Sequence, residues 1–153
     1  MSAAEFEIST DRGRIDVGLV HAFLSGVSYW ARGRSRAIVQ ASIENSLCFG
    51  AYRDGRQVGF CRVITDYAVF GYVADMFVLP QWRGRGVGKL LVRAVVEHPV
   101  VAGLPGLQLR SRDARQLYEK FGFRTAPRPE EIMARPSAEK AGSTSSVSGS
   151  GEQ

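Results

Sequence analysis

One short loop near the middle of the chain alternates cationic and flexible residues in a way that suits a phosphate ligand. Its cations are Arg83, Arg85 and Lys89, and its glycines are Gly84, Gly86 and Gly88. Glycine adopts backbone conformations that other residues resist, and it lets the chain approach a ligand closely. A helical apolar pattern begins at Val87, so the loop also offers the free N–H groups and the positive dipole end of a helix start. These features predict a pyrophosphate site over residues 83–89.

The spacing of the glycines separates this loop from two other phosphate-binding loops. A dinucleotide-binding loop reads G-x-G-x-x-G after a first strand, with an acidic residue about 20 positions further on. A P-loop reads G-x-x-x-x-G-K-[ST]. This loop reads G-x-G-x-G, and it lies deep in the chain after several strand-like segments. A plain glycine-rich turn is the remaining alternative, and the clustered cations argue against it.

The overall charge favours an anionic partner without naming one. The 153 residues carry a formal net charge of +5, and the isoelectric point is about 9.6. Nucleic acid, a membrane surface and a polyphosphate cofactor all suit a basic protein. Because three cations gather in the loop 83–89, the polyphosphate cofactor is the preferred interpretation.

Several other classes of protein are excluded. The N-terminal segment MSAAEFEISTDRGR lacks the basic and apolar regions of a signal peptide. No apolar run approaches the roughly 18 residues that span a bilayer. Cys48 and Cys61 lie in apolar stretches without metal-ligand spacing, so both are expected to be reduced core residues. We therefore expect a cytoplasmic protein that needs no membrane and no metal.

The elements that must position this loop follow from hydrophobic periodicity. A first strand is expected around Phe6 and Ile8, and Asp54-Gly55 predicts a tight hairpin. Helices are expected over 15–30, 36–45, 87–98 and 113–121, and further strands over 47–53, 57–66, 70–79, 107–111 and 123–126. This order predicts an α/β (α+β) fold, with an antiparallel meander followed by βαβ-type crossovers.

The last segment, residues 137–153, is rich in serine and glycine and has almost no large apolar side chains. Such a composition buries too little surface to offset the entropy of ordering the chain. The sequence therefore predicts one domain over residues 1–136, which is an ordinary size, and a disordered tail over 137–153.

Two motifs together identify a family resemblance. Arg83-x-x-Gly86-x-Gly88 matches the R/Q-x-x-G-x-G/A acyl-CoA motif of the GNAT (GCN5-related N-acetyltransferase) superfamily, and Val78-x-Pro80 stands at the family's usual offset before it. The stretch DARQLYEKFGF, residues 113–123, resembles the family's A-x-x-LYEKxGF segment. The motifs occur in the family's order and at its usual separation. The resemblance covers about residues 5–135.

The resemblance implies a GNAT fold with a mixed central sheet and helices on both faces. It implies an N-acetyltransferase that uses acetyl-CoA and transfers the acetyl group to a primary amine by direct attack in a ternary complex. The acceptor would be a small molecule or a peptide, and the protein a monomer or homodimer that binds no nucleic acid.

The resemblance also assigns cofactor-binding residues. Backbone groups of Met76, Phe77 and Val78 would hold the pantetheine arm and polarise the thioester carbonyl, and residues 83–89, Val87 included, would hold the pyrophosphate. Many members have Asn seven residues before the motif tyrosine, Tyr118, where this chain has Ser111. The cofactor contact at Ser111 is therefore expected to be weaker or replaced.

Tyr118 and Asp75 are the predicted catalytic residues. A phenol with a pKa of about 10 is neutral at pH 7 and can donate a proton or hydrogen bond to a leaving thiolate. Asp75 is a lone carboxylate in the apolar segment YVADMFV, and burial there is expected to raise its pKa towards that of a general base. The structural alternatives are a tyrosine packed on a helix face, and an aspartate bonded to the backbone or an arginine.

The acceptor site is expected to come from the first helices and their connection. Tyr29, Trp30 and Arg34 gather aromatic and cationic groups there, which would suit an acidic or aromatic acceptor. Asp66, at the end of its strand, is a second carboxylate assigned to this site. The alternative is a solvated basic loop with Trp30 in the core.

Two other functions stay open. A non-catalytic acyl-CoA-binding module of the same fold would lack the roles given to Tyr118 and Asp75. A nucleic-acid-binding domain would use the arginines at positions 32, 34, 36, 110, 112 and 115, although no known binding motif accompanies them. The identity of the acceptor amine does not follow from the sequence.

Overall fold

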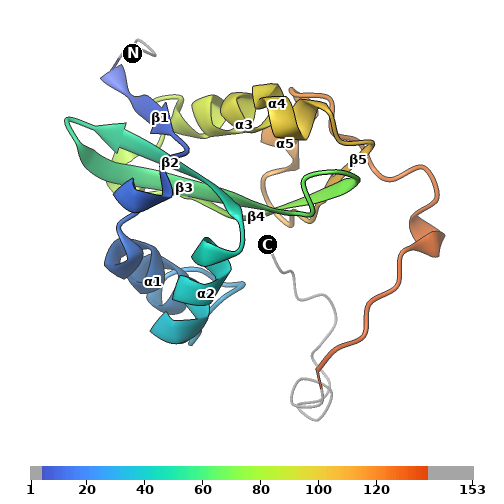
Figure 1. The fold of residues 1–153 in the computed structure, drawn as a ribbon, viewed down its shortest axis with the longest axis horizontal. Helices are drawn as coiled ribbons and strands as arrows, with labels where there is room; N and C mark the ends of the chain where they lie inside the picture. Colours follow the sequence, from blue (N-terminus) through green and yellow to red (C-terminus); the bar gives the residue numbers. More distant parts are fainter. Residues whose placement is uncertain (1–4, 138–153) are drawn as a thin grey trace.

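Five strands form one mixed sheet in the order β1-β2-β3-β4-β5 in the computed structural model, which describes residues 5–137 (Figure 1). The strands are β1 (Glu7–Ser9), β2 (Leu47–Arg53), β3 (Arg56–Thr65), β4 (Phe70–Val78) and β5 (Gly106–Leu109). The first four pair antiparallel, and β4 pairs with β5 in parallel. The predicted meander followed by a crossover is confirmed.

The turn between β2 and β3 forms where the sequence predicts it. Asp54 and Gly55 both have positive φ, 52° and 80°. Two left-handed residues in succession make the type I′ turn whose twist matches that of the flanking strands. The turn fixes the register of the hairpin, in which Arg53 pairs with Arg56.

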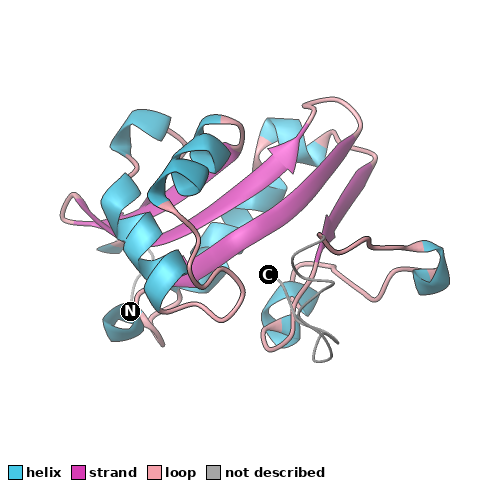
Figure 2. Ribbon diagram, turned by 90° about the horizontal axis from the view of Figure 1, so that it is seen from below, coloured by secondary structure: helices cyan, strands magenta, loops and turns pink. Residues whose placement is uncertain are grey.

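Helices cover both faces of the sheet, as the resemblance implies. In Figure 1, α1 (Val17–Gly26) and α2 (Arg36–Glu44) lie below the sheet, and α3 (Val87–Glu97) and α4 (Pro99–Ala102) lie above it. Figure 2, viewed from below, shows helices in front of the strands and helices behind them. The short helix α5 (Arg115–Glu119) follows β5, and 3₁₀ turns lie at Arg12–Arg14, Pro80–Trp82 and Pro129–Glu131.

Side chains at the helix starts explain where α1 and α2 begin. The carboxylate of Asp16 accepts a hydrogen bond from the N–H of Leu19, and the Ser35 hydroxyl accepts one from the N–H of Ile38. Both bonds satisfy a backbone donor that a helix start otherwise leaves free. The cap at Asp16 also means that α1 starts later than expected.

The sheet separates two apolar cores. One core packs α3 against the sheet and includes Phe49, Val63 and Leu91, all nearly inaccessible to solvent. The other packs α1 and α2 against the opposite face and includes Phe23 and Phe60. Cys48 and Cys61 are buried and unpaired, as predicted.

A β-bulge interrupts β4 three residues before its end. Cys61 on β3 faces both Asp75 and Met76 on β4, so β4 carries one extra residue there. The flanking pairs are Phe60 with Phe77 and Arg62 with Ala74. Asp75 has φ 55°, a left-handed conformation that is uncommon for a residue with a side chain. Bulges bend a strand and re-aim its side chains, often beside functional sites.

Some predicted boundaries are wrong. The first helix ends at Gly26 rather than Trp30, because the Ser28 hydroxyl binds the Leu24 carbonyl and the N–H of Ala31 and so turns the chain out of the helix. The predicted helix over 113–121 covers only Arg115–Glu119. Pro99 ends α3, as expected, but it also begins α4, which was not predicted.

The predicted strand over 123–126 does not form. The described chain there is irregular, and its polar contacts run to side chains, such as the bond from Arg115 to the Thr125 hydroxyl. Pro127 and Pro129 follow closely, and proline cannot donate to a strand ladder. The predicted tail over 137–153 lies outside the described residues apart from Ser137. No helix within residues 5–137 is long and apolar enough to cross a membrane.

Candidate active site

A cavity of about 640 Å³ lies where the end of β4, the start of α3 and the end of α1 meet the segment before and within α5. This volume is in the range of small-molecule and cofactor sites. The cavity brings together ten of the predicted site residues: Tyr29, Trp30, Met76, Phe77, Val78, Arg83, Gly84, Gly86, Val87 and Gly88. It is also lined by residues that sequence reasoning missed, namely Phe23, Val27, Ser28, Trp82, Asp113, Ala114 and Leu117.

The loop before α3 has the backbone geometry of a phosphate cradle. Gly84 and Gly86 have φ of 79° and 86°, and no atom lies within 4 Å of where a side chain would begin at either position. Gly86 caps α3, and the first helical bond is donated by Leu90 to the Gly86 carbonyl. Within residues 5–137, the N–H groups of Val87, Gly88 and Lys89 have no hydrogen-bond partner, so they are available to an anion.

The cations of this loop surround the cradle in different ways. Nε of Arg83 donates to the Val78 carbonyl at 3.0 Å, which fixes the side chain against the end of β4. The Arg85 guanidinium lies 4.9 Å from the ring centre of Trp82, which lines the cavity. Lys89 is exposed on the first turn of α3. Arg85 and Lys89 do not line the cavity themselves.

The edge of β4 that faces β5 is paired only over its first part. Phe70 to Val73 pair with Gly106 to Leu109, and β5 then ends while β4 continues to Val78. Within the described part of the chain, the β5-facing edge of β4 beyond Val73 therefore has no strand partner. Met76, Phe77 and Val78 lie on this stretch and line the cavity. An extended ligand can bind to this unpaired edge through backbone hydrogen bonds.

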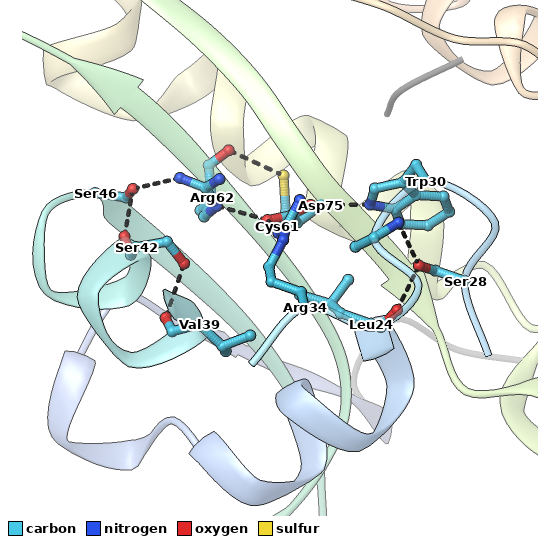
Figure 3. A network of polar contacts seen from close by, with 11 residues as sticks. Leu24, Ser28, Trp30, Arg34, Val39, Ser42, Ser46, Cys61, Arg62 and Asp75 are labelled. Carbon is cyan, nitrogen blue, oxygen red and sulfur yellow. Dashed lines mark hydrogen bonds and ion pairs between the residues drawn. The ribbon is translucent and has the colours of Figure 1, made fainter. Parts of the chain in front are cut away.

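Asp75 is buried, with 2% of its surface exposed, but its chemistry differs from the expectation. Its carboxylate accepts hydrogen bonds from Arg62 Nε at 2.7 Å, Arg34 at 2.9 Å and Trp30 Nε1 at 2.9 Å (Figure 3). Burial raises the pKa of Asp75, but the charges of Arg62 and Arg34 and these hydrogen bonds outweigh it, so the pKa is lowered from its ordinary value. The expectation of a raised pKa is wrong.

The contacts of Asp75 extend into a network below the sheet. Arg62 also donates to the Ser46 hydroxyl, which in turn donates to the Ser42 carbonyl in α2 (Figure 3). Arg34 belongs to this network through its ion pair with Asp75. The network thus joins the loop between α1 and α2 to the bulge of β4, and it orients Trp30, which lines the cavity.

Two other predicted residues lie apart from the cavity. Asp66 lies in the turn between β3 and β4, where its carboxylate accepts hydrogen bonds from the N–H groups of Val69, Ala68 and Phe70. These hydrogen bonds lower the pKa of Asp66. That turn is at the other end of β4 from Met76 to Val78, so the structure does not bring Asp66 together with Tyr29 and Trp30 at the cavity. The Ser111 hydroxyl accepts the N–H of Ala114 and lines a second cavity beside β5.

Tyr118 is buried in α5, with 4% of its surface exposed, and its ring packs edge-on against Phe123. It lines the second cavity, whereas Leu117 beside it lines the first. Burial raises the pKa of Tyr118, and the Asp113 carboxylate adds to this effect. The phenol is therefore protonated at neutral pH, so it can donate a hydrogen bond or a proton but does not act as a phenolate base.

The missed residues had weak sequence signals. Asp113 stands inside the motif that carries the family resemblance, but nothing in its spacing marks it as a cavity residue. Phe23 and Val27 belong to the apolar face of α1 and resemble ordinary core positions; in the structure Phe23 stacks on Phe77, with ring centres 4.1 Å apart. Within the described residues, no group of three or more metal-binding side chains is present.

Comparisons with known proteins agree with this geometry. A family model described as an acetyltransferase (GNAT) domain matches residues 44–125. A protein of Gibberella zeae named as a proposed acetyltransferase is 28% identical over 138 residues, which cover 76% of this chain and 77% of that protein. An aminoglycoside N(6')-acetyltransferase type 1 of Stenotrophomonas maltophilia is 30% identical over 100 residues, which cover 58% of this chain and 65% of that protein.

A solved structure is similar over most of its length. The crystal structure of a protein assigned to the GNAT family as an acetyltransferase, from Xanthomonas campestris pv. campestris, superimposes with a TM-score of 0.84 at 46% identity. The similarity covers 86% of this chain and 93% of that chain. The mixed five-stranded sheet, the match to the family model and this structural neighbour together establish that the chain belongs to the GNAT acetyltransferase superfamily.

Proposed function

We propose that the protein is an acetyl-CoA-dependent N-acetyltransferase that transfers the acetyl group to a primary amine by direct attack in a ternary complex. One observation carries the proposal: the glycine cradle at the start of α3 and the unpaired edge of β4 open onto the same cavity. The first suits a pyrophosphate and the second suits an extended amide-bearing arm. Acetyl-CoA combines both groups in one molecule.

The residues present fit this cofactor. The free N–H groups of Val87, Gly88 and Lys89 point out of a helix start, where a negative charge is stabilised. Arg83, Arg85 and Lys89 supply positive charge beside them. When bound, the cofactor supplies a thioester whose acetyl carbon an amine can attack.

The chain's own groups would serve three tasks. The edge of β4 holds the thioester carbonyl and orients it. The aromatic wall formed by Tyr29 and Trp30 excludes water from the amine. The Tyr118 hydroxyl, on α5 next to the cavity residue Leu117, would donate a hydrogen bond to the sulfur as negative charge develops there.

The protons balance without Asp75. An ammonium acceptor loses two protons in becoming an amide: one on forming the neutral nucleophile and one after the nitrogen–carbon bond has formed. One proton ends on the leaving sulfur, and the other is released to water. Asp75 is held as a carboxylate by two arginines, so we assign it to holding the loop that carries Trp30 in place.

A calorimetric titration with acetyl-CoA tests the cofactor assignment. We expect one molecule to bind per chain. Its affinity should fall as salt is added, because salt screens the attraction between the phosphates and the cations of the loop. Ligand at 100 times its dissociation constant should also stabilise the fold by about 2.7 kcal/mol in a thermal melt. An absence of heat and of any melting shift at millimolar acetyl-CoA would refute the assignment.

A further inference from the structure

The part of the cavity wall that lies outside the loop 83–89 is mostly apolar and aromatic. Phe23 and Val27 from α1, Tyr29 and Trp30 from the following loop, and Leu117 from α5 all face this space. Tyr29 and Trp30 pack edge to face, with ring centres 5.1 Å apart. The Arg112 guanidinium lies 3.6 Å from the centre of the Tyr29 ring and fixes its orientation. The wall is therefore a preformed surface for an apolar body.

Among residues 5–137, the charged side chains that line the cavity are Arg83 and Asp113. Arg83 belongs to the cradle, and its Nε is bonded to the Val78 carbonyl. The Asp113 carboxylate is exposed and forms no hydrogen bond or ion pair with any residue between 5 and 137. Asp113 and Tyr29 line the same cavity, and the carboxylate adds to the effect of burial in raising the pKa of Tyr29.

The cations near the aromatic wall already make contacts within the protein. Arg34 and Arg62 both bind the Asp75 carboxylate beneath the bulge of β4 (Figure 3). Arg112 lies over the Tyr29 ring. An acceptor with a carboxylate or phosphate beside Asp113 would therefore bring a second negative charge towards that carboxylate, and neither Arg34 nor Arg62 is free to offset it. The acidic acceptor expected from Arg34 is disfavoured by this arrangement.

We infer that the acceptor is a primary amine carried on an apolar or aromatic body without an anionic group, with its ammonium bound by Asp113 and its body packed on Tyr29 and Trp30. The inference rests on the proposed function and narrows it to one substrate class. A carboxylate favours the charged form of the amine before reaction, and the aromatic faces add a cation–π attraction. Asp113 thus acts as a specificity-determining residue at the mouth of the reaction site.

The test uses cations that bind but cannot be acetylated. Phenethyltrimethylammonium, benzyltrimethylammonium and hexyltrimethylammonium are titrated into the wild-type protein saturated with CoA. The matched anion and neutral compound are 3-phenylpropionate and 2-phenylethanol. At least one cation is expected to bind about tenfold more tightly than both, which is about 1.4 kcal/mol.

Variants separate Asp113 from general surface charge. Asp113→Asn should weaken cation binding about twofold to fivefold, the range of an exposed charge pair, because a quaternary ammonium has no N–H and loses only the charge attraction; CoA affinity should be unchanged. Glu119→Gln removes another exposed carboxylate on α5 that lines the second cavity only, and it should leave cation binding unchanged. The corresponding primary amines should release CoA thiol from acetyl-CoA, with an Asp113→Asn defect in KM.

The outcomes distinguish the two proposals. If CoA fails to bind, the proposed function itself is wrong. If CoA binds but no cation does, or if the anion binds as tightly as the cations, only the acceptor inference is overturned. Equal loss of cation binding in Asp113→Asn and Glu119→Gln would also overturn it, because the effect would then reflect overall charge.

Discussion

The indole Nε1 of Trp30 donates a hydrogen bond to Oδ1 of Asp75 at 2.9 Å, and this bond joins the loop after α1 to the bulge in β4. Asp75 has a left-handed backbone, φ 55°, and the contacts of its side chain offset the strain of this conformation. The same carboxylate forms ion pairs with both Arg34 and Arg62. One buried side chain therefore holds the aromatic wall of the cavity against the strand that would bind the cofactor.

Asp75→Asn should destabilise the protein by about 3–5 kcal/mol, the usual effect of removing one partner from a buried ion pair. Asparagine tolerates a left-handed backbone, so the loss reports the missing charge and not the turn. Urea unfolding of the two proteins measures the change.

Asp54→Asn is the matched control for this substitution. Asp54 also has a left-handed backbone, φ 52°, but its side chain is 90% exposed. Its replacement should change the free energy of unfolding by no more than about 0.5 kcal/mol. Similar effects of the two substitutions would show that Asp75 is not held by its arginines in solution.

The stabilisation that Asp75 provides should depend on pH. Its pKa is lower in the folded protein than its ordinary value, because the arginines outweigh the effect of burial. The contribution is therefore complete above the ordinary aspartate pKa, about 4, and is lost as the pH falls through the folded value. The stability difference between wild type and Asp75→Asn should be constant from pH 5 to 8 and shrink below pH 4. A difference that grows on acidification would contradict the assigned ion pairs.

The strands of the meander were predicted well because their signals are local, whereas the predicted strand over 123–126 does not form. β2 has the predicted bounds, Leu47–Arg53, because turn residues flank it, and the Asp54-Gly55 turn depends only on its own two residues. The cradle could also be predicted, since its glycines and cations lie within seven consecutive positions.

The environment of Asp75 could not be predicted in the same way. Its partners Arg34 and Arg62 lie 41 and 13 residues away in the sequence; the register of β3 against β4 brings Arg62 to Asp75, and the packing of the loop between α1 and α2 brings Arg34. Asp113 reaches the cavity because the segment before α5 folds over the end of β4, which no periodic pattern encodes. The bulge likewise follows from the register of β3 against β4 and not from a turn residue.

Gly86→Glu should weaken acetyl-CoA binding at least about 100-fold while the protein stays folded. The new carboxylate would occupy the open space at the cradle, where it repels phosphate, and two lost charge-assisted hydrogen bonds account for about 3 kcal/mol or more. Calorimetry with acetyl-CoA measures the affinity, and circular dichroism checks the fold.

Gly55→Glu controls for backbone strain. Gly55 has a similar φ, 80°, and the same open surroundings, but it lies in the hairpin turn away from the cavity. This variant should bind acetyl-CoA like the wild type. Equal losses of affinity in both variants would show that strain, and not the cradle, explains the effect.

Tyr118→Phe should lower turnover by roughly 10- to 100-fold and leave acetyl-CoA affinity unchanged. The ring and its packing on Phe123 are retained, and only a donor needed as charge develops on sulfur is lost. A thiol with a pKa of about 8.5 gives a thiolate that can leave without being protonated. The expected loss of turnover is therefore at the low end of the range for general acid catalysis. Unchanged turnover, with chemistry shown to be rate-limiting, would assign Tyr118 a packing role.

The most direct test of acetyl transfer is to measure two products in the same reaction. Purified protein is incubated with acetyl-CoA and a panel of primary amines, and both free CoA thiol and acetylated amine are quantified, with Gly86→Glu as the inactive control. We predict equimolar thiol and N-acetyl product with at least one amine of apolar or aromatic body, and neither product above background with Gly86→Glu. Thiol release without acetylated amine across the whole panel, or equal product from the wild type and Gly86→Glu, would contradict the proposed function.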